Sequence, residues 1–124
     1  MPRTARLDIP GVLQHVIVRG IERRNIFLDD QDRSLFLARF SALLQRTSTH
    51  CFAWSLMSNH FHLLLMPTTT PLSHVMRSLL TGYAVGFNRK YQRAGHLFQN
   101  RYKSGSSAES VMIFRLRQFA KCVI

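Results

Sequence analysis

The stretch Met57-Ser-Asn-His-Phe-His-Leu-Leu-Leu-Met66 decides how the rest of the chain is interpreted. In a β-strand alternate side chains share a face, so His60 and His62 project to one side and Phe61 projects to the other. Three leucines follow at once, which indicates a strand whose other face is buried and whose histidines are held in fixed rotamers. Two imidazoles placed in this way can bind one metal ion if another group completes the site. The same spacing also suits two structural histidines.

The size and composition of the chain indicate one domain. A chain of 124 residues can bury a single hydrophobic core, and 46% hydrophobic residues is typical of a globular protein. No apolar run approaches the roughly 20 residues that span a bilayer, and no signal peptide is recognisable at the N-terminus. We therefore expect a cytoplasmic protein without a membrane partner.

The net charge of +11 is unevenly distributed along the chain. Residues 1–32 hold five basic and five acidic residues, whereas twelve basic residues and a single acidic one, Glu109, follow from residue 33 onward. An excess of this size attracts polyanions, and nucleic acid is the most common of these. The charge by itself is equally consistent with a protein that binds acidic molecules without specificity.

Hydrophobic periodicity predicts a β-α-β-β-α-β order of elements. Asp29 or Asp30 is expected to cap the first helix, and Thr70 the second, with Pro71 at its first helical position. A further helix is expected at the C-terminus, over Glu109–Ile124. The expected strands and long helices are Leu13–Gly20, a helix to about Arg46, Cys51–Met57, His60–Met66, a helix to about Gln92, and Leu97–Lys103.

This order fits an α+β fold, a ferredoxin-like antiparallel sheet with helices packed on one face. Gly82 and Gly86 lie one turn apart in the second helix and weaken it, so we expect them to allow close packing on the sheet.

Basic and aromatic residues alternate near the end of the second helix and beyond it. Cations that follow a phosphate backbone and aromatic rings that stack on bases are typical of single-strand binding, although the rings also suit a core. The residues concerned are Arg89, Lys90, Arg93, Arg101 and Lys103, with Phe87, Tyr91, Phe98 and Tyr102. The remaining histidines have no partner at a useful spacing and are expected to be structural: His15, His50, His74 and His96.

Several blocks of this sequence together resemble the REP-associated tyrosine transposases, which are single-tyrosine transposases with a His-hydrophobe-His signature. The resemblance covers about residues 1–104 and rests on Met1-Pro-Arg-Thr-Ala-Arg-Leu7, Arg19-Gly-Ile-Glu-Arg-Arg24, Met57–Leu65, Leu79-Leu-Thr-Gly-Tyr-Ala84 and Gly95-His-Leu-Phe-Gln-Asn-Arg-Tyr-Lys-Ser104.

The resemblance implies a ferredoxin-like nuclease domain that binds single-stranded, hairpin-forming DNA. It implies a divalent ion, Mg²⁺ or Mn²⁺, on His60 and His62 that polarises the scissile phosphate while a tyrosine attacks. With the charge pattern it favours nucleic-acid contacts by basic residues: Arg19, Arg23, Arg24, Arg77, Arg89, Lys90, Arg93, Arg101 and Lys103. It also leaves a homodimer open and suggests association with the nucleoid.

The resemblance breaks down after Ser104. Relatives carry the nucleophilic tyrosine on a helix beyond this block, but no tyrosine follows Tyr102 in this chain. We therefore divide the domain into a transposase-like part, residues 1–104, and a divergent tail, residues 105–124. We expect DNA and metal binding with weak or absent cleavage. The alternative is a catalytically inactive nucleic-acid-binding module, or a regulator derived from a transposase.

Overall fold

The computed structural model describes residues 10–99 and 102–105. The expected order of elements is confirmed, with a short 3₁₀ turn, η1, after the first strand. The four strands form one antiparallel sheet in the order β2-β3-β1-β4, which is the ferredoxin-like arrangement. The elements are β1 (Gln14–Arg19), η1 (Ile21–Arg23), α1 (Asp30–Thr47), β2 (His50–Leu56), β3 (His60–Met66), α2 (Leu72–Lys90) and β4 (Lys103–Gly105).

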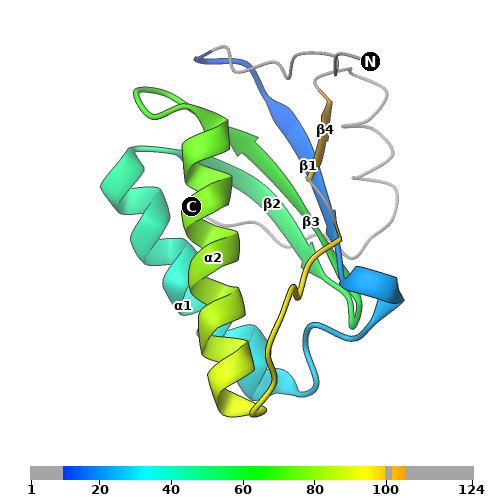
Figure 1. The fold of residues 1–124 in the computed structure, drawn as a ribbon. Helices are drawn as coiled ribbons and strands as arrows, with labels where there is room; N and C mark the ends of the chain where they lie inside the picture. The colour runs from blue at the N-terminus through cyan, green and yellow to red at the C-terminus, as the bar shows by residue number, and fades with distance from the viewer. Residues whose placement is uncertain (1–9, 100–101, 106–124) are drawn as a thin grey trace.

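Both long helices cover the same face of the sheet (Figure 1). The central strands β1 and β3 turn alternate residues toward these helices, and the core between the two layers is apolar. Phe61 is fully buried there, with its ring centroid 4.8 Å from that of Phe36 on α1. The core residues of β1 and β3 are Val16, Val18, Phe61, Leu63 and Leu65.

The two helices begin differently from one another. The Asp29 side chain accepts a hydrogen bond from the Asp32 amide at 2.9 Å, which confirms Asp29 as the cap of α1. The expectation for α2 is wrong by one residue, because Pro71 itself occupies the cap position and Leu72 is the first helical residue. The proline ring has no atom that can accept a hydrogen bond, so the helix starts without a side-chain cap.

The segment that follows α2 differs from the single strand expected over Leu97–Lys103. Phe98 forms only an isolated bridge with Gly20, and regular pairing with β1 begins at Lys103 and extends to Gly105, two residues beyond the end of the expected strand. The predicted helix over Glu109–Ile124 lies outside the described residues.

Gly82 and Gly86 do not pack on the sheet, contrary to expectation. A methyl group at Gly82 would lie 2.8 Å from Nη1 of Arg39 on α1, and one at Gly86 would lie 3.8 Å from Nη2 of the same residue. The two glycines therefore face the neighbouring helix. In the part of the chain that the structure describes, neither long helix is apolar enough to cross a membrane.

Candidate functional site

His60 and His62 lie on the sheet face that is turned away from α1 and α2. Their neighbour Phe61 is in the core, so the alternation of β3 directs both imidazoles to the other side, as expected. The ring centroids are 5.1 Å apart with an angle of 75° between the ring planes. His60 is partly exposed, whereas His62 is buried, with 6% of its surface accessible. We call this side of β1 and β3, with His15, Ile17, Arg19, His60 and His62, the histidine face.

The His60 ring is held by the residue before it. Its Nδ1 lies 2.8 Å from Oδ1 of Asn59, and Nδ2 of Asn59 donates to the Arg23 carbonyl at 3.4 Å. A carbonyl oxygen can only accept, so Nδ2 must face Arg23 and Oδ1 must face the imidazole. Oδ1 is in turn an acceptor, so the proton of this hydrogen bond belongs to His60 Nδ1.

The His62 ring is held by His15, a residue that we expected to have no useful partner. Nε2 of His15 lies 3.0 Å from Nδ1 of His62, and the two rings stack with centroids 5.3 Å apart. His15 is opposite Leu64 in the antiparallel register, so it meets His62 diagonally across the pair of strands. The alternation of β1 predicts that His15 lies on the same side of the sheet as Ile17 and Arg19. That it meets His62 depends on the register between β1 and β3, which the alternation does not give.

A loop next to β1 supports the turn that precedes His60. The Gly20 amide donates to the Asn59 carbonyl at 2.9 Å, and the Ile26 amide donates to the Ser58 carbonyl at 2.8 Å. A Cβ atom at Gly20 would lie 2.2 Å from the Arg24 carbonyl oxygen, so the loop can fold back this tightly only over glycine. The loop is therefore hydrogen-bonded to two consecutive residues of the turn, Ser58 and Asn59.

Three of the predicted DNA-binding cations belong to this end of the histidine face. Arg19 is directly opposite His60 in the register of β1 and β3, and its side chain is exposed. Arg23 and Arg24 lie in the supporting loop and are also exposed. Lys103 is opposite Ile17 in the register of β4, and Arg101 lies outside the described residues. A cationic rim thus adjoins the imidazoles.

The other predicted cations lie on α2 or just after it, in the helix layer. Arg77 and Arg89 are exposed there. Lys90 forms an ion pair with the buried carboxylate of Asp32, at 2.7 Å, and that hydrogen bond raises the pKa of the lysine. Arg93 donates to the Asn88 side chain and to the His96 carbonyl, at 2.7 and 3.0 Å. Lys90 and Arg93 thus form contacts within the chain.

All three tyrosines of the chain are on the helix side of the sheet. Tyr83 donates its hydroxyl hydrogen to the Ile26 carbonyl, and burial raises the pKa of its phenol. Tyr91 donates to Asp32 Oδ2 at 2.7 Å. Its pKa is raised as well, mainly by burial and secondly by this hydrogen bond. Tyr102 is buried in the core. As expected from the sequence, these tyrosines have structural positions, and each is separated from the histidines by the sheet.

The imidazole nitrogens on the histidine face suit part of the ligand set of a metal site. Ligation by a neutral imidazole requires a lone pair on one ring nitrogen, and a proton on Nδ1 leaves that pair on Nε2. Within residues 10–99 and 102–105, no group of three or more histidine, cysteine or carboxylate side chains is arranged to hold a metal ion. Two imidazoles fit a divalent ion only as a partial set, to which other ligands must add.

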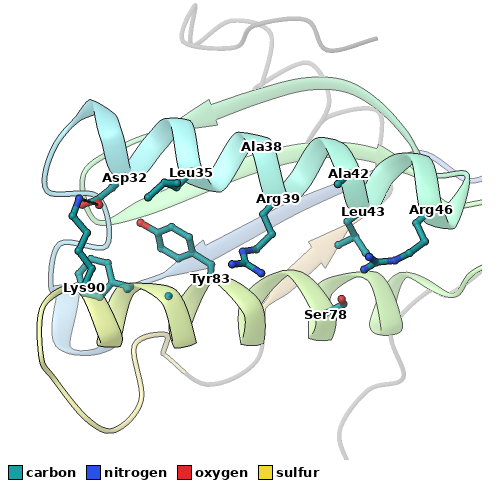
Figure 2. Close-up of a pocket in the computed structure, with 12 residues that line it drawn as sticks. Asp32, Leu35, Ala38, Arg39, Ala42, Leu43, Arg46, Ser78, Tyr83 and Lys90 are labelled. Atoms are coloured by element: carbon teal, nitrogen blue, oxygen red, sulfur yellow. Dashed lines mark hydrogen bonds and ion pairs between the residues drawn. The ribbon is translucent and has the colours of Figure 1, made fainter.

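A hollow lies between α1 and α2, with a volume of about 550 Å³ (Figure 2). The guanidinium groups of Arg39 and Arg46 project into it, and the ion pair of Asp32 and Lys90 closes one end. The small residues Ala38, Ala42 and Gly86 are also among those that line it. This groove is in the helix layer, so the sheet separates it from the histidines.

The comparisons with known proteins agree with this architecture. The family model described as "Transposase IS200 like" matches residues 9–118, a range that runs past Ser104. A REP-associated tyrosine transposase bound to a REP hairpin has a similar structure, with a TM-score of 0.70, 16% identity, and coverage of 92% of this chain and 68% of the other.

A proposed transposase from Deinococcus radiodurans R1 is similar as well, with a TM-score of 0.68, 15% identity and 94% of each chain covered. At these identities the two structures show a common fold. A comparison with curated proteins finds no match.

Proposed function

Because the chain belongs to the IS200-like transposase family, we propose that its histidine face binds single-stranded or hairpin DNA and holds Mg²⁺ or Mn²⁺ on His60 and His62. The observation that carries this proposal is the pairing of the two imidazoles on one face of β3, with Arg19 directly opposite His60. A DNA phosphate at Arg19 would therefore lie next to a metal-binding position.

Each group on this face has a role in the proposed complex. Arg19, Arg23 and Arg24 bind the phosphate backbone, and their exposed guanidinium groups can approach it from both β1 and the loop. His60 and His62 hold the ion, which when bound stabilises the negative charge that builds on a phosphate under attack. A phosphate oxygen and water complete the ligand set, because Mg²⁺ and Mn²⁺ prefer oxygen ligands.

The position of the tyrosines favours the second candidate, a DNA-binding protein that does not cleave. The hydroxyls of Tyr83 and Tyr91 are engaged in the helix layer, Tyr102 is in the core, and a raised pKa makes a phenolate nucleophile scarcer. We therefore propose that this 124-residue chain binds the DNA and the ion but forms little or no covalent phosphotyrosine product. In the cell it would act in the cytoplasm, at the nucleoid.

Binding of labelled oligonucleotides by the purified chain tests the first proposal. A hairpin with a single-stranded flank, an unpaired strand and a blunt duplex of equal length are compared by fluorescence anisotropy, with and without Mn²⁺. We expect the hairpin and the unpaired strand to bind more tightly than the duplex, with affinities that fall steeply with salt. His60→Ala and His62→Ala should remove the Mn²⁺-dependent part of the affinity, whereas the exposed control His74→Ala should retain it.

A denaturing gel of the same reactions tests the second proposal. We expect no covalent protein–DNA band with the hairpin and Mn²⁺. A band that is lost in one tyrosine variant would show that the chain is a nuclease and would identify its nucleophile. Equal binding of all three oligonucleotides would contradict the preference for unpaired or hairpin DNA. Sedimentation of the free protein decides between a monomer and a homodimer.

A further inference from the structure

The contacts of the two imidazoles continue beyond the histidines themselves. His60 is held by Asn59 and His62 is held by His15, in both cases through Nδ1. The two partners come from different elements, because Asn59 lies in the turn before β3 and His15 lies on β1. Each imidazole is thus held at its Nδ1 atom, and the two holding residues come from separate parts of the chain.

For His60, the chain of contacts determines which nitrogen carries the proton. The Arg23 carbonyl accepts from Asn59 Nδ2, so Asn59 Oδ1 accepts from His60 Nδ1. The neutral ring then has its lone pair on Nε2. The Arg23 carbonyl is itself positioned by a backbone in the left-handed region, with φ values of 52° at Glu22 and 59° at Arg23. Residues other than glycine rarely adopt this backbone conformation. Here the hydrogen bonds of the loop with Ser58 and Asn59 maintain it.

For His62, the partner is buried with it. His15 is 8% exposed and His62 is 6% exposed, so the hydrogen bond between them is shielded from water. One nitrogen must donate and the other accept, and ring stacking at 5.3 Å keeps both imidazoles in a fixed orientation. When His62 Nδ1 is the donor, its lone pair is on Nε2, as in His60.

From this geometry we infer that His15 and Asn59 are positioning residues, which hold His62 and His60 in the Nδ1-protonated tautomer, so that each ring has its lone pair on Nε2. The inference rests on the proposed function, in which His60 and His62 are metal ligands. The tautomers themselves can be measured without metal. Partners of this kind fix ring orientation and make the ring a stronger ligand. Both residues act through the histidines and are not ligands in this scheme.

Nuclear magnetic resonance of ¹⁵N-labelled protein without metal gives the first test. At alkaline pH, where the imidazoles are neutral, two-bond ¹H–¹⁵N correlations distinguish a protonated Nδ1 from a protonated Nε2. We expect protonated Nδ1 on both His60 and His62 in the unaltered chain. A protonated Nε2 on His62 would overturn the role of His15, and the same result on His60 would overturn that of Asn59.

Variants give the second test, with Mn²⁺ alone as the probe and its affinity measured by electron paramagnetic resonance. His15→Leu removes the acceptor at nearly constant volume, and we expect about a tenfold to hundredfold loss of affinity. His15→Gln places an amide oxygen near the position of Nε2 and should restore the affinity to within about threefold of the original. The control His74→Ala alters an exposed histidine of α2 and should have no effect.

Asn59→Ala keeps the test decisive even if His15→Leu does not fold, because Asn59 is only half-buried, in the turn before β3. We expect about a tenfold loss of Mn²⁺ affinity and a mixture of His60 tautomers, with an unchanged unfolding midpoint. Unchanged tautomers and affinity in both His15→Leu and Asn59→Ala would overturn the inference. A chain with the expected tautomers but no Mn²⁺ binding would instead contradict the proposed metal site and leave the positioning roles intact.

Discussion

The histidine face and the helix layer both contain buried polar groups and exposed cations, but they use them differently. In the helix layer, the Asp32 carboxylate accepts hydrogen bonds from the Leu28 amide, the Lys90 ammonium and the Tyr91 hydroxyl. These contacts join the start of α1 to the end of α2. On the histidine face, the contacts instead fix one nitrogen of each imidazole. Polar networks therefore stabilise the fold in one layer and orient candidate ligands in the other.

This contrast is sharpest within β3, whose neighbouring residues serve the two sides. Phe61 is fully buried and is in contact with the helix layer, whereas His60 is partly exposed on the opposite face. Loss of Phe61 should thus affect stability, and loss of His60 should affect binding. The four predictions that follow test this division between the helix layer and the histidine face.

Phe61→Ala should have the largest effect, with a decrease of about 3–5 kcal/mol in the free energy of unfolding, because it leaves a cavity among aromatic rings. His60→Ala, on the adjacent residue, should cost less than about 1 kcal/mol. Urea unfolding followed by circular dichroism measures both. Comparable losses in the two variants would show that the histidine face is as important to the fold as the core.

Asp32→Asn should lower the free energy of unfolding by about 2 kcal/mol, because the amide cannot accept all three hydrogen bonds or form the ion pair with Lys90. Asp30→Asn is the matched control, since the Asp30 carboxylate is exposed and its ion pair with Arg33 contributes little. Thermal or urea unfolding at neutral pH distinguishes the two variants.

The cost of Asp32→Asn should also depend on pH. Burial by itself raises the pKa of Asp32, but hydrogen bonds from Lys90, Tyr91 and Leu28 outweigh it and hold the pKa below its ordinary value. The carboxylate therefore stabilises the fold at pH values above its unfolded pKa of about 3.9, and this contribution disappears as the pH falls through the folded pKa. A difference between the two proteins that stays constant from neutral pH to below pH 3 would contradict this account.

Arg19→Ala with Arg24→Ala should weaken binding of hairpin DNA about tenfold and lower the salt dependence, because both cations border the histidine face. Arg77→Ala with Arg89→Ala removes the same charge from α2 and should change the affinity less than about twofold. Anisotropy titrations at several salt concentrations measure both effects. A larger loss for the α2 pair would place the DNA on the helix layer and reverse the comparison.

The elements themselves were predictable because local rules govern them. Alternation in Met57–Met66 correctly placed the two histidines together and Phe61 in the core, and Asp29 was correctly expected to cap α1. The cap of α2 was misplaced by one residue, since a proline can begin a helix without a side-chain acceptor. The division of the domain after Ser104, into a transposase-like part and a divergent tail, remains a prediction.

Contacts between elements were not predictable in the same way. His15 and His62 are 47 residues apart, and nothing near His15 indicates which β3 residue it meets until the register is known. The glycines of α2 likewise suggested a close neighbour but not that the neighbour is Arg39 of α1. The predicted cations formed one set in the sequence, whereas those among the described residues are divided between two layers.

The amino-acid order alone determined which side chains share a face within each strand or helix, because backbone geometry repeats over two residues in a strand and 3.6 in a helix. It also determined the excess of positive charge and the presence of two imidazoles on one side of β3. Tertiary structure alone decided which nitrogens those imidazoles present and which cations lie beside them. Both depend on the register between strands, which is set by packing across the whole core.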